Sequence, residues 1–313
     1  MKGKYFFIFG FLFIVLTFGF WQRDFMASLF LALQGGRQVI SPISQQLAQN
    51  QPDGGQILGE ITTLEADYDF GQIQNKNEVL SAGAVAYDLT ADRIIYKKNE
   101  SGHLQAASTV KIVTAAVALD RGKLEEEMTV NYFPTVVGES SMNLAFGEKF
   151  SLEELLYGLL LNSGNDAAET IAQGIGGKRE TYVEWMNEFM QKLGAKDTHF
   201  TTPSGLDEDG QYTSAWDLFL AGRYIFSHYP PILEISTTRE KYLPKTSGHR
   251  AYLLRNKLLL LGEFPIIAAK PGLGEQGMMS LVALLEVNKH RILTVFIQTP
   301  SLRHDLTKIL KML

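Results

Sequence analysis

Strand patterns at both ends of residues 79–313 enclose a long helical block, and this order is the strongest constraint on the fold. Residues 79–87 and 93–98 are rich in β-favouring side chains on either side of a turn-like stretch, which predicts a hairpin. Further strands are expected at 264–270, 278–287 and 291–298, and a closing helix at 302–313. A parallel sheet would alternate strands with helices. The order predicts instead an α+β fold, with an antiparallel sheet whose first and last strands meet and with the helices inserted between them.

The inserted block contains several helical patterns. They cover residues 108–119, 151–161, 165–175, 178–193 and 214–227. The first has apolar residues at helical spacing and contains neither glycine nor proline, so it is expected to be largely buried. The second opens with Ser151 and Glu154, the pattern of a capping box.

The first 24 residues predict how the chain leaves the cytoplasm. Lys2 and Lys4 precede an uncharged apolar run from Tyr5 to Trp21, which as a helix would be about 25 Å long, at the short end for a membrane span. The basic flank predicts an anchor with the N-terminus inside and the rest of the chain outside. A cleaved signal peptide, giving a secreted or periplasmic protein, is the alternative, although charged residues stand where a cleavage site is expected. A buried core helix is the third interpretation.

Residues 25–77 are predicted to form a juxtamembrane segment and a flexible linker. An apolar patch at 25–33 is suited to the membrane interface, and the stretch that follows contains Gly-Gly twice and a run of polar residues. Such a composition buries too little apolar surface to order itself. The expected organisation is therefore an anchor at 1–24, a linker at 25–77 and one globular domain at 78–313.

Composition excludes several classes of function. Lys and Arg number 29 and Asp and Glu 34, a formal net charge of −5, so nucleic acid is not an expected partner. The chain has no cysteine, which excludes disulfides, thiolate zinc sites, iron–sulfur clusters and a cysteine nucleophile. The six histidines form no recognisable metal motif, so neither a metal nor a cofactor is expected.

Ser108 and Lys111 stand at the start of the buried helical pattern, three residues apart, and can therefore share one helix face. A serine hydroxyl becomes a nucleophile when a base lies within hydrogen-bond reach. A lysine amine can be that base if burial or a nearby cation lowers its pKa. Because Ser-x-x-Lys also arises by chance in a chain of this length, the pair alone is more simply explained as a helix cap and a lysine that reaches the surface.

Two later motifs strengthen the catalytic interpretation. Ser163 and Asn165 lie in the segment Asn-Ser-Gly-Asn-Asp-Ala, which interrupts the helical pattern, and Lys270-Pro271-Gly272 ends a strand-like run. Two other segments match these motifs only superficially. Ser141-Met142-Asn143 lacks the Gly-Asn-Asp-Ala context, and Lys245-Thr246-Ser247-Gly248 lies in a polar loop.

In this order, Ser-x-x-Lys, Ser-x-Asn and Lys-x-Gly resemble the serine penicillin-recognising proteins, and more closely the D-alanyl-D-alanine carboxypeptidases of low molecular mass. The resemblance covers roughly residues 78–313 and includes the stretch Arg255–Leu259, which is similar to the family's segment before its third motif. It implies a β-lactamase/transpeptidase-like fold, with an antiparallel sheet of about five strands flanked by helices and an inserted helical subdomain.

The resemblance also implies a role for each site residue. Ser108 would attack the carbonyl of a terminal D-Ala-D-Ala bond, Lys111 would accept its proton, and Ser163 would relay a proton to the leaving amine. Asn165 would hold Lys111 or the substrate amide, and Lys270 would supply positive charge. The backbone N–H groups of Ser108 and Leu273, beside Gly272, would bind the oxyanion.

Two residues depart from the family pattern. Pro271 stands where the family has a threonine whose hydroxyl helps to bind the substrate carboxylate, and proline offers neither a hydroxyl nor an N–H. Gly274 replaces a residue that often carries a hydroxyl. Proline is tolerated mainly on edge strands, so the fold is expected to survive Pro271 while carboxylate binding weakens.

Three functions follow from these observations. The first is a membrane-tethered serine D-Ala-D-Ala carboxypeptidase or endopeptidase that acts on peptidoglycan stem peptides and is acylated by β-lactam antibiotics. The second, motivated by Pro271 and Gly274, is a weak or inactive wall-binding or scaffold protein. The third is a β-lactamase, which would need a deacylating base. Glu169 lies near the second motif but is more simply a carboxylate on a helix face.

Overall fold

The computed structural model describes residues 79–206, 208–274 and 277–313. The expected anchor at 1–24 and linker at 25–77 lie outside these ranges and stay predictions. Within the described ranges, no helix has both the length and the apolar character needed to cross a membrane.

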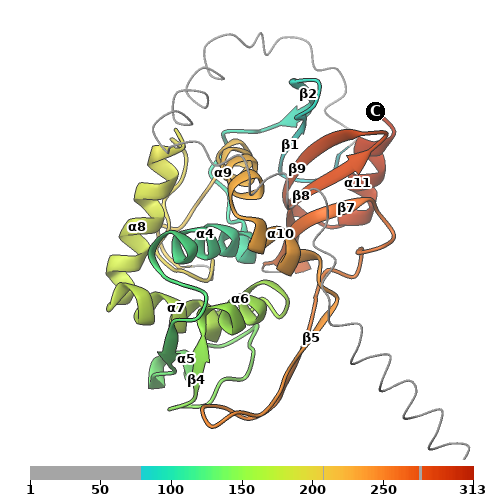
Figure 1. The fold of residues 1–313 in the computed structure, drawn as a ribbon. Coiled ribbons are helices and arrows are strands. Elements are labelled where there is room, and N and C mark those ends of the chain that lie inside the picture. The colour runs from blue at the N-terminus through green and yellow to red at the C-terminus, as the bar shows by residue number, and fades with distance from the viewer. Residues whose placement is uncertain (1–78, 207, 275–276) are drawn as a thin grey trace, which may run out of the picture. The chain divides into compact units, whose positions relative to one another are not determined.

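A five-stranded antiparallel sheet, with strand order β2-β1-β9-β8-β7, forms the centre of the fold (Figure 1). Its strands are β1 (Gly83–Asp88), β2 (Arg93–Lys98), β7 (Ile266–Leu273), β8 (Met279–Val287) and β9 (His290–Thr299). The first strand pairs with the last one along its whole length. This pairing confirms the predicted α+β sheet in which the two ends of the domain meet.

Helices cover both faces of the sheet. The chain between β2 and β7 contributes the 3₁₀ turn η2 (Ala107–Val110), α4 (Lys111–Arg121), α6 (Leu152–Leu160), α7 (Asn165–Gly176), α8 (Arg179–Lys192), α9 (Ala215–His228) and α10 (Pro230–Thr237). The last helix, α11 (Leu302–Leu310), packs on the opposite face (Figure 1). Side chains along β1 alternate between the two faces of the sheet. Val85 and Tyr87 face the helical block, and Ala84 and Ala86 face α11.

The predicted helices begin and end within a few residues of the observed ones, and side-chain caps mark the starts of α6, α9 and α11. Ser151 accepts from the Glu154 N–H and Glu154 accepts from the Ser151 N–H, which confirms the predicted capping box at the start of α6. The closing helix ends at Leu310, three residues earlier than predicted, and the first strand begins at Gly83 rather than at residue 79.

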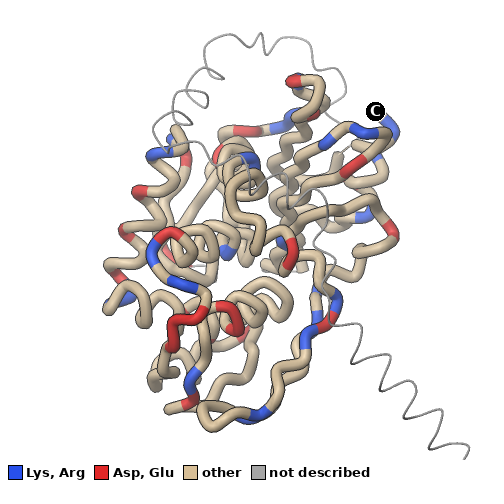
Figure 2. The backbone as a smooth tube through the Cα atoms, in the orientation of Figure 1, with Lys and Arg blue, Asp and Glu red and all other residues tan. Residues whose placement is uncertain are grey.

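Several short elements were not predicted from the sequence. They are β3 (Glu127–Thr129), α5 (Tyr132–Val136), β4 (Lys149–Ser151), α10, β5 (Glu240–Leu243) and β6 (Tyr252–Arg255). Strands of three or four residues leave too short an alternation to recognise. The β5–β6 ribbon also carries Lys and Arg along its length (Figure 2), a composition that is typical of a loop.

Asp305 on α11 ties the last helix to the first described residues. Its carboxylate is fully buried and accepts hydrogen bonds from the backbone N–H of Leu80, at 2.8 Å, and of Ser81, at 3.1 Å. The Ser81 hydroxyl donates to the same carboxylate. A buried carboxylate is stable only with such donors, so these bonds fix the start of the domain against α11.

Replacement of Asp305 by alanine is expected to lower the free energy of unfolding by about 3 kcal/mol, because buried donors lose a charged acceptor. Urea unfolding followed by circular dichroism measures the change. Lys311→Ala, an exposed substitution just beyond the same helix, is the control and should leave the midpoint unchanged. A loss below about 1 kcal/mol for Asp305→Ala would show that these contacts do not join the two ends.

Candidate active site

Ser108 lies in the 3₁₀ turn η2, directly before α4, and is half-buried. The turn is entered through Ala107, whose φ of +48° is a left-handed conformation. Gly205 lies against this turn, and a Cβ at that position would come within 2.2 Å of the Ala107 carbonyl oxygen. The tight turn places the Ser108 hydroxyl at the start of the helix, where Lys111 Nζ lies 2.8 Å from Ser108 Oγ.

The amine of Lys111 has three oxygen neighbours. Its Nζ donates to Asn165 Oδ1 at 2.7 Å and to the Ser204 carbonyl oxygen at 2.6 Å, and both of these oxygens can only accept. A neutral amine has two N–H groups and one lone pair, so after these two bonds its lone pair is left for the Ser108 hydroxyl. The three contacts therefore allow Lys111 to draw the proton from Ser108.

The pKa of Lys111 lies well below its ordinary value, first because the side chain is fully buried and the ammonium loses its hydration. The positive charges of Lys270 and Lys257 lower this pKa further, while Glu139 and Asp166 act in the opposite direction. A lysine whose pKa is lowered in this way can serve as a general base.

Ser163 and Lys270 form a second pair beside the first. Ser163 occupies the turn between α6 and α7 with a φ of +58°, and its Oγ accepts from Lys270 Nζ at 2.9 Å. Lys270 also donates to the Pro271 carbonyl oxygen at 2.8 Å. Burial, and then the charge of Lys257, lower the pKa of Lys270 to about 7.

The first turn of α7 organises the loop above the two pairs. Asn165 donates from its backbone N–H to the Ser140 carbonyl and from Nδ2 to the Gly138 carbonyl. The neighbouring carboxylate of Asp166 accepts from Ser141 Oγ and from two backbone N–H groups of the same loop. The superficial Ser141-Met142-Asn143 match thus holds the loop rather than a lysine. The other superficial match, 245–248, lies in the loop between β5 and β6.

Strand β7 contributes Lys270, Gly272 and Leu273 from the edge of the sheet. Gly274 donates to the Met278 carbonyl, so by the alternation of an antiparallel pair the N–H of Leu273 points away from β8. The N–H of Ala269 has the same direction and donates to Ser236 Oγ on α10. A Cβ at Gly272 would come within 3.1 Å of the Ser108 nitrogen, so this strand lies directly against the nucleophile's turn.

The same alternation explains how the sheet accepts Pro271. Its nitrogen faces the outer side of β7, where no ladder hydrogen bond is required. The structure therefore confirms the edge position that was expected for this proline.

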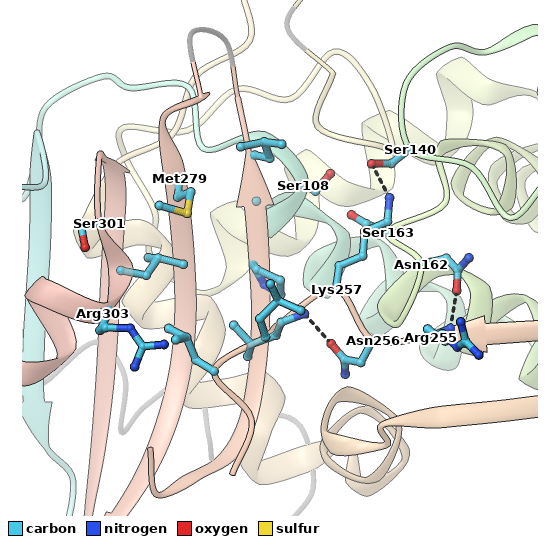
Figure 3. A pocket seen from close by; sticks show the side chains of 17 residues that line it. Ser108, Ser140, Asn162, Ser163, Arg255, Asn256, Lys257, Met279, Ser301 and Arg303 are labelled. Carbon is cyan, nitrogen blue, oxygen red and sulfur yellow. Dashed lines mark hydrogen bonds between the residues drawn. The ribbon is translucent and has the colours of Figure 1, made fainter. Parts of the chain in front are cut away.

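Two hollows meet at Ser108. The larger, of about 800 Å³, extends past Ser163 over β7 and β8 toward the start of α11, and the smaller, of about 570 Å³, extends toward Gly205 and Gly274. Figure 3 shows Ser108 and Ser163 at the edge of β7 in the larger hollow. No group of His, Asp and Glu side chains in the described ranges has the arrangement of a metal site.

The structure brings together every residue predicted for the site, namely Ser108, Lys111, Ser163, Asn165, Lys270, Gly272 and Leu273. It also adds Lys257, which sequence analysis did not select. Lys257 Nζ donates to Ser140 Oγ at 3.0 Å, and its side chain lines both hollows (Figure 3). The signal available in the sequence was its position in the stretch Arg255–Leu259.

The five-stranded sheet, the α11 layer and the Ser108–Lys111 pair define a β-lactamase/transpeptidase-like protein with a serine–lysine site. Residues 71–301 match the family model described as D-alanyl-D-alanine carboxypeptidase, peptidase family S11. The chain belongs to this family.

Relatives with this description come from several bacteria. The chain is 28% identical over 235 residues to the D-alanyl-D-alanine carboxypeptidase DacF of Bacillus subtilis, which covers 74% of this chain and 60% of that one. It is 35% identical over 164 residues to DacD of Escherichia coli, covering 49% of this chain and 42% of the relative. The chain thus spans less than two thirds of the length of these relatives.

Solved structures share the fold. A penicillin-binding protein homologue from Mycobacterium tuberculosis is 25% identical, with a TM-score of 0.70 over 78% of this chain and 94% of that one. A variant of the Streptomyces K15 DD-transpeptidase is 23% identical, with a TM-score of 0.69 over 76% and 97% of the two chains.

Removal of the Lys257 charge should change the pH dependence of acylation at Ser108. Because this cation lowers the pKa of both Lys111 and Lys270, the pair in Lys257→Met will hold its protons to higher pH. The pH of half-maximal acylation by a penicillin should therefore rise by about half a unit, and Lys257→Arg should restore the original profile. Stopped-flow measurements between pH 5 and 10 give the profile.

Lys245→Met, which removes an exposed lysine from the loop between β5 and β6, is the matched control and should leave the profile unchanged. An unshifted profile in Lys257→Met, or a shift of equal size in Lys245→Met, would contradict a local charge effect.

Proposed function

We propose that this protein is a membrane-tethered serine-type D-Ala-D-Ala carboxypeptidase that acts on peptidoglycan stem peptides through an acyl-enzyme on Ser108. The observation that carries the proposal is the contact of 2.8 Å between Ser108 Oγ and the fully buried amine of Lys111. Membership of the D-alanyl-D-alanine carboxypeptidase family supports the choice of substrate.

In the first half of the reaction, Ser108 Oγ attacks the carbonyl carbon of the terminal peptide bond, and its proton passes to the neutral Lys111. The backbone N–H groups of Ser108 and Leu273 stabilise the negative charge that forms on the carbonyl oxygen. Support for this role comes from the direction of the Leu273 N–H and from the packing of β7 against the turn at Ser108.

In the second half, the C–N bond breaks and Ser163 passes a proton to the leaving amine, which departs as a free amino acid. Before this transfer the Lys270 ammonium supplies positive charge next to the substrate carboxylate, and through its contact with Ser163 Oγ it then replaces the proton that Ser163 gave away. Water next attacks the ester carbonyl and gives a proton to Lys270, while Lys111 returns its proton to the departing Ser108 Oγ, which regenerates the enzyme. Asn165 holds the Lys111 amine throughout, as its contact of 2.7 Å allows.

Tethering by residues 1–24, with the enzyme outside the cytoplasm, is part of the proposal. It rests on the basic flank and the apolar run from Tyr5 to Trp21, which lie outside the described residues. A substrate outside the cytoplasm fits that placement.

A β-lactamase would require a base for rapid deacylation. Glu169, the carboxylate considered from the sequence, is buried on α7 and pairs with Arg179 at 3.1 Å. It lines neither of the two hollows that meet at Ser108. These contacts favour a structural role for Glu169 over that of a deacylating base.

Acylation by a penicillin tests the proposal directly. Intact-mass analysis of the full-length protein should show the addition of one penicillin, and Ser108→Ala should show none, because the adduct is an ester of the Ser108 hydroxyl. Ser247→Ala, a substitution in the exposed Lys-Thr-Ser-Gly loop, should be acylated like the unaltered protein. A folded protein that gains no mass would favour the wall-binding or scaffold alternative.

Pro271→Thr measures how far the missing hydroxyl lowers the rate of peptide cleavage. Turnover of a peptide that ends in D-Ala-D-Ala should rise by about tenfold, because the threonine restores a hydrogen bond to the substrate carboxylate. Release of D-alanine gives the rate. Pro271→Ala restores the N–H without the hydroxyl and should bring a smaller rise. An unchanged or lower rate in Pro271→Thr would show that proline does not limit carboxylate binding.

A further inference from the structure

The two hollows at Ser108 divide the substrate between them. Ser163 lines the larger hollow and not the smaller one, whereas Ser108 lines both. In the mechanism proposed above, on which this inference rests, Ser163 protonates the amine of the leaving residue. This arrangement favours the larger hollow for the leaving residue and the smaller one for the acyl part of the peptide.

The larger hollow combines polar residues around Ser108 and Ser163 with a group of apolar side chains. They are Leu258, Leu259, Leu260, Pro271, Leu273 and Met279, joined by Leu302 at the start of α11. Leu259 is 84% exposed and Leu273 is 67% exposed, so two apolar side chains stand open to solvent beside the reaction centre. Covering large, exposed apolar side chains with an apolar group lowers the free energy, because apolar surface is removed from water.

The hollow is also larger than an alanine requires. At about 800 Å³ it is in the range of sites that bind drug-sized ligands, whereas the side chain of D-alanine is one methyl group. Pro271 places an apolar ring where a threonine would place a hydroxyl. That hydroxyl would hold the substrate carboxylate tightly and favour a small leaving residue. The size and the lining of the hollow both favour an apolar side chain larger than that of alanine.

Two arginines add positive charge to the hollow that also receives the substrate carboxylate beside Lys270. Arg255 and Arg303 line the hollow at opposite sides, and their side chains are 72% and 59% exposed (Figure 3). Each pairs with an exposed glutamate, Glu240 and Glu263, and exposed pairs of this kind are weak. An arginine can therefore turn to a substrate carboxylate without loss of a strong partner.

We propose that the hollow formed by the 258–260 segment, β7 and β8 is a subsite for a branched or longer apolar side chain on the leaving residue. The preferred substrates are then acyl-D-Ala-D-Xaa peptides in which Xaa is apolar and larger than alanine. The released product is the corresponding free D-amino acid.

The test compares two acylated peptides that differ only in the last residue, D-Ala-D-Leu and D-Ala-D-Ala. The full-length protein should cleave the D-leucine peptide with a kcat/KM about tenfold higher, as expected for extra methylene groups in an apolar site. Leu259→Ala should lower this ratio by at least about threefold, since it removes apolar surface from the subsite. A general loss of activity would lower both rates and leave the ratio unchanged.

Leu253→Ala is the matched control. Leu253 is also an exposed leucine, at 47%, but it lies on β6 away from the hollow, so its removal should leave the ratio as in the unaltered protein. A ratio of one or less in the unaltered protein, or an unchanged ratio in Leu259→Ala, would overturn the subsite.

The outcome also separates the two proposals. Cleavage of both peptides at equal rates, with a penicillin adduct on Ser108, would reject the subsite and leave the proposed function standing. Absence of both cleavage and adduct would reject the proposed function and the subsite with it.

Discussion

Two lysine amines, those of Lys111 and Lys270, are fully buried a short distance apart, and neither forms a salt bridge in the ranges that the structure describes. Burial of a lysine without a carboxylate is rare because an ammonium loses its hydration. Burial and then the charge of neighbouring lysines lower the pKa of both amines, which donate to serine, amide and carbonyl oxygens. The reactivity proposed for Ser108 depends on this one arrangement.

Four separate parts of the chain are needed to build it. The turn before α4 presents Ser108, the left-handed turn before α7 presents Ser163, and β7 brings Lys270 into contact with Ser163. The carbonyl of Ser204 accepts from Lys111. The first half of the outer edge of β7 is covered by α10, where Ser236 accepts from the strand, and the second half is left free for the cleft. The unpaired backbone groups of an uncovered edge can pair with a strand of another chain. Pro271 disfavours such pairing because it lacks an N–H.

Much of this organisation could be predicted from residues that act locally. The capping box at Ser151 and the spacing of Ser108 and Lys111 determine structure within a turn or two of helix, so pattern and outcome agree. Lys257 was missed because its importance depends on its distance from two other amines, which lie at positions 111 and 270. The short β3, β4, β5 and β6 strands were missed for a similar reason, since each is stabilised by its partner strand rather than by its own composition.

The pairing of β1 with β9 has a consequence for how the molecule folds. The two strands are separated by about two hundred residues, and β1 lies between β2 and β9 in the finished sheet. During synthesis β1 and β2 are made long before β9. The backbone groups on the edge of β1 that faces β9 therefore lack their strand partner until β9 has been made. Closing so long a loop is slow, so the intervening helices are in a position to condense first and to serve as the surface on which the sheet assembles.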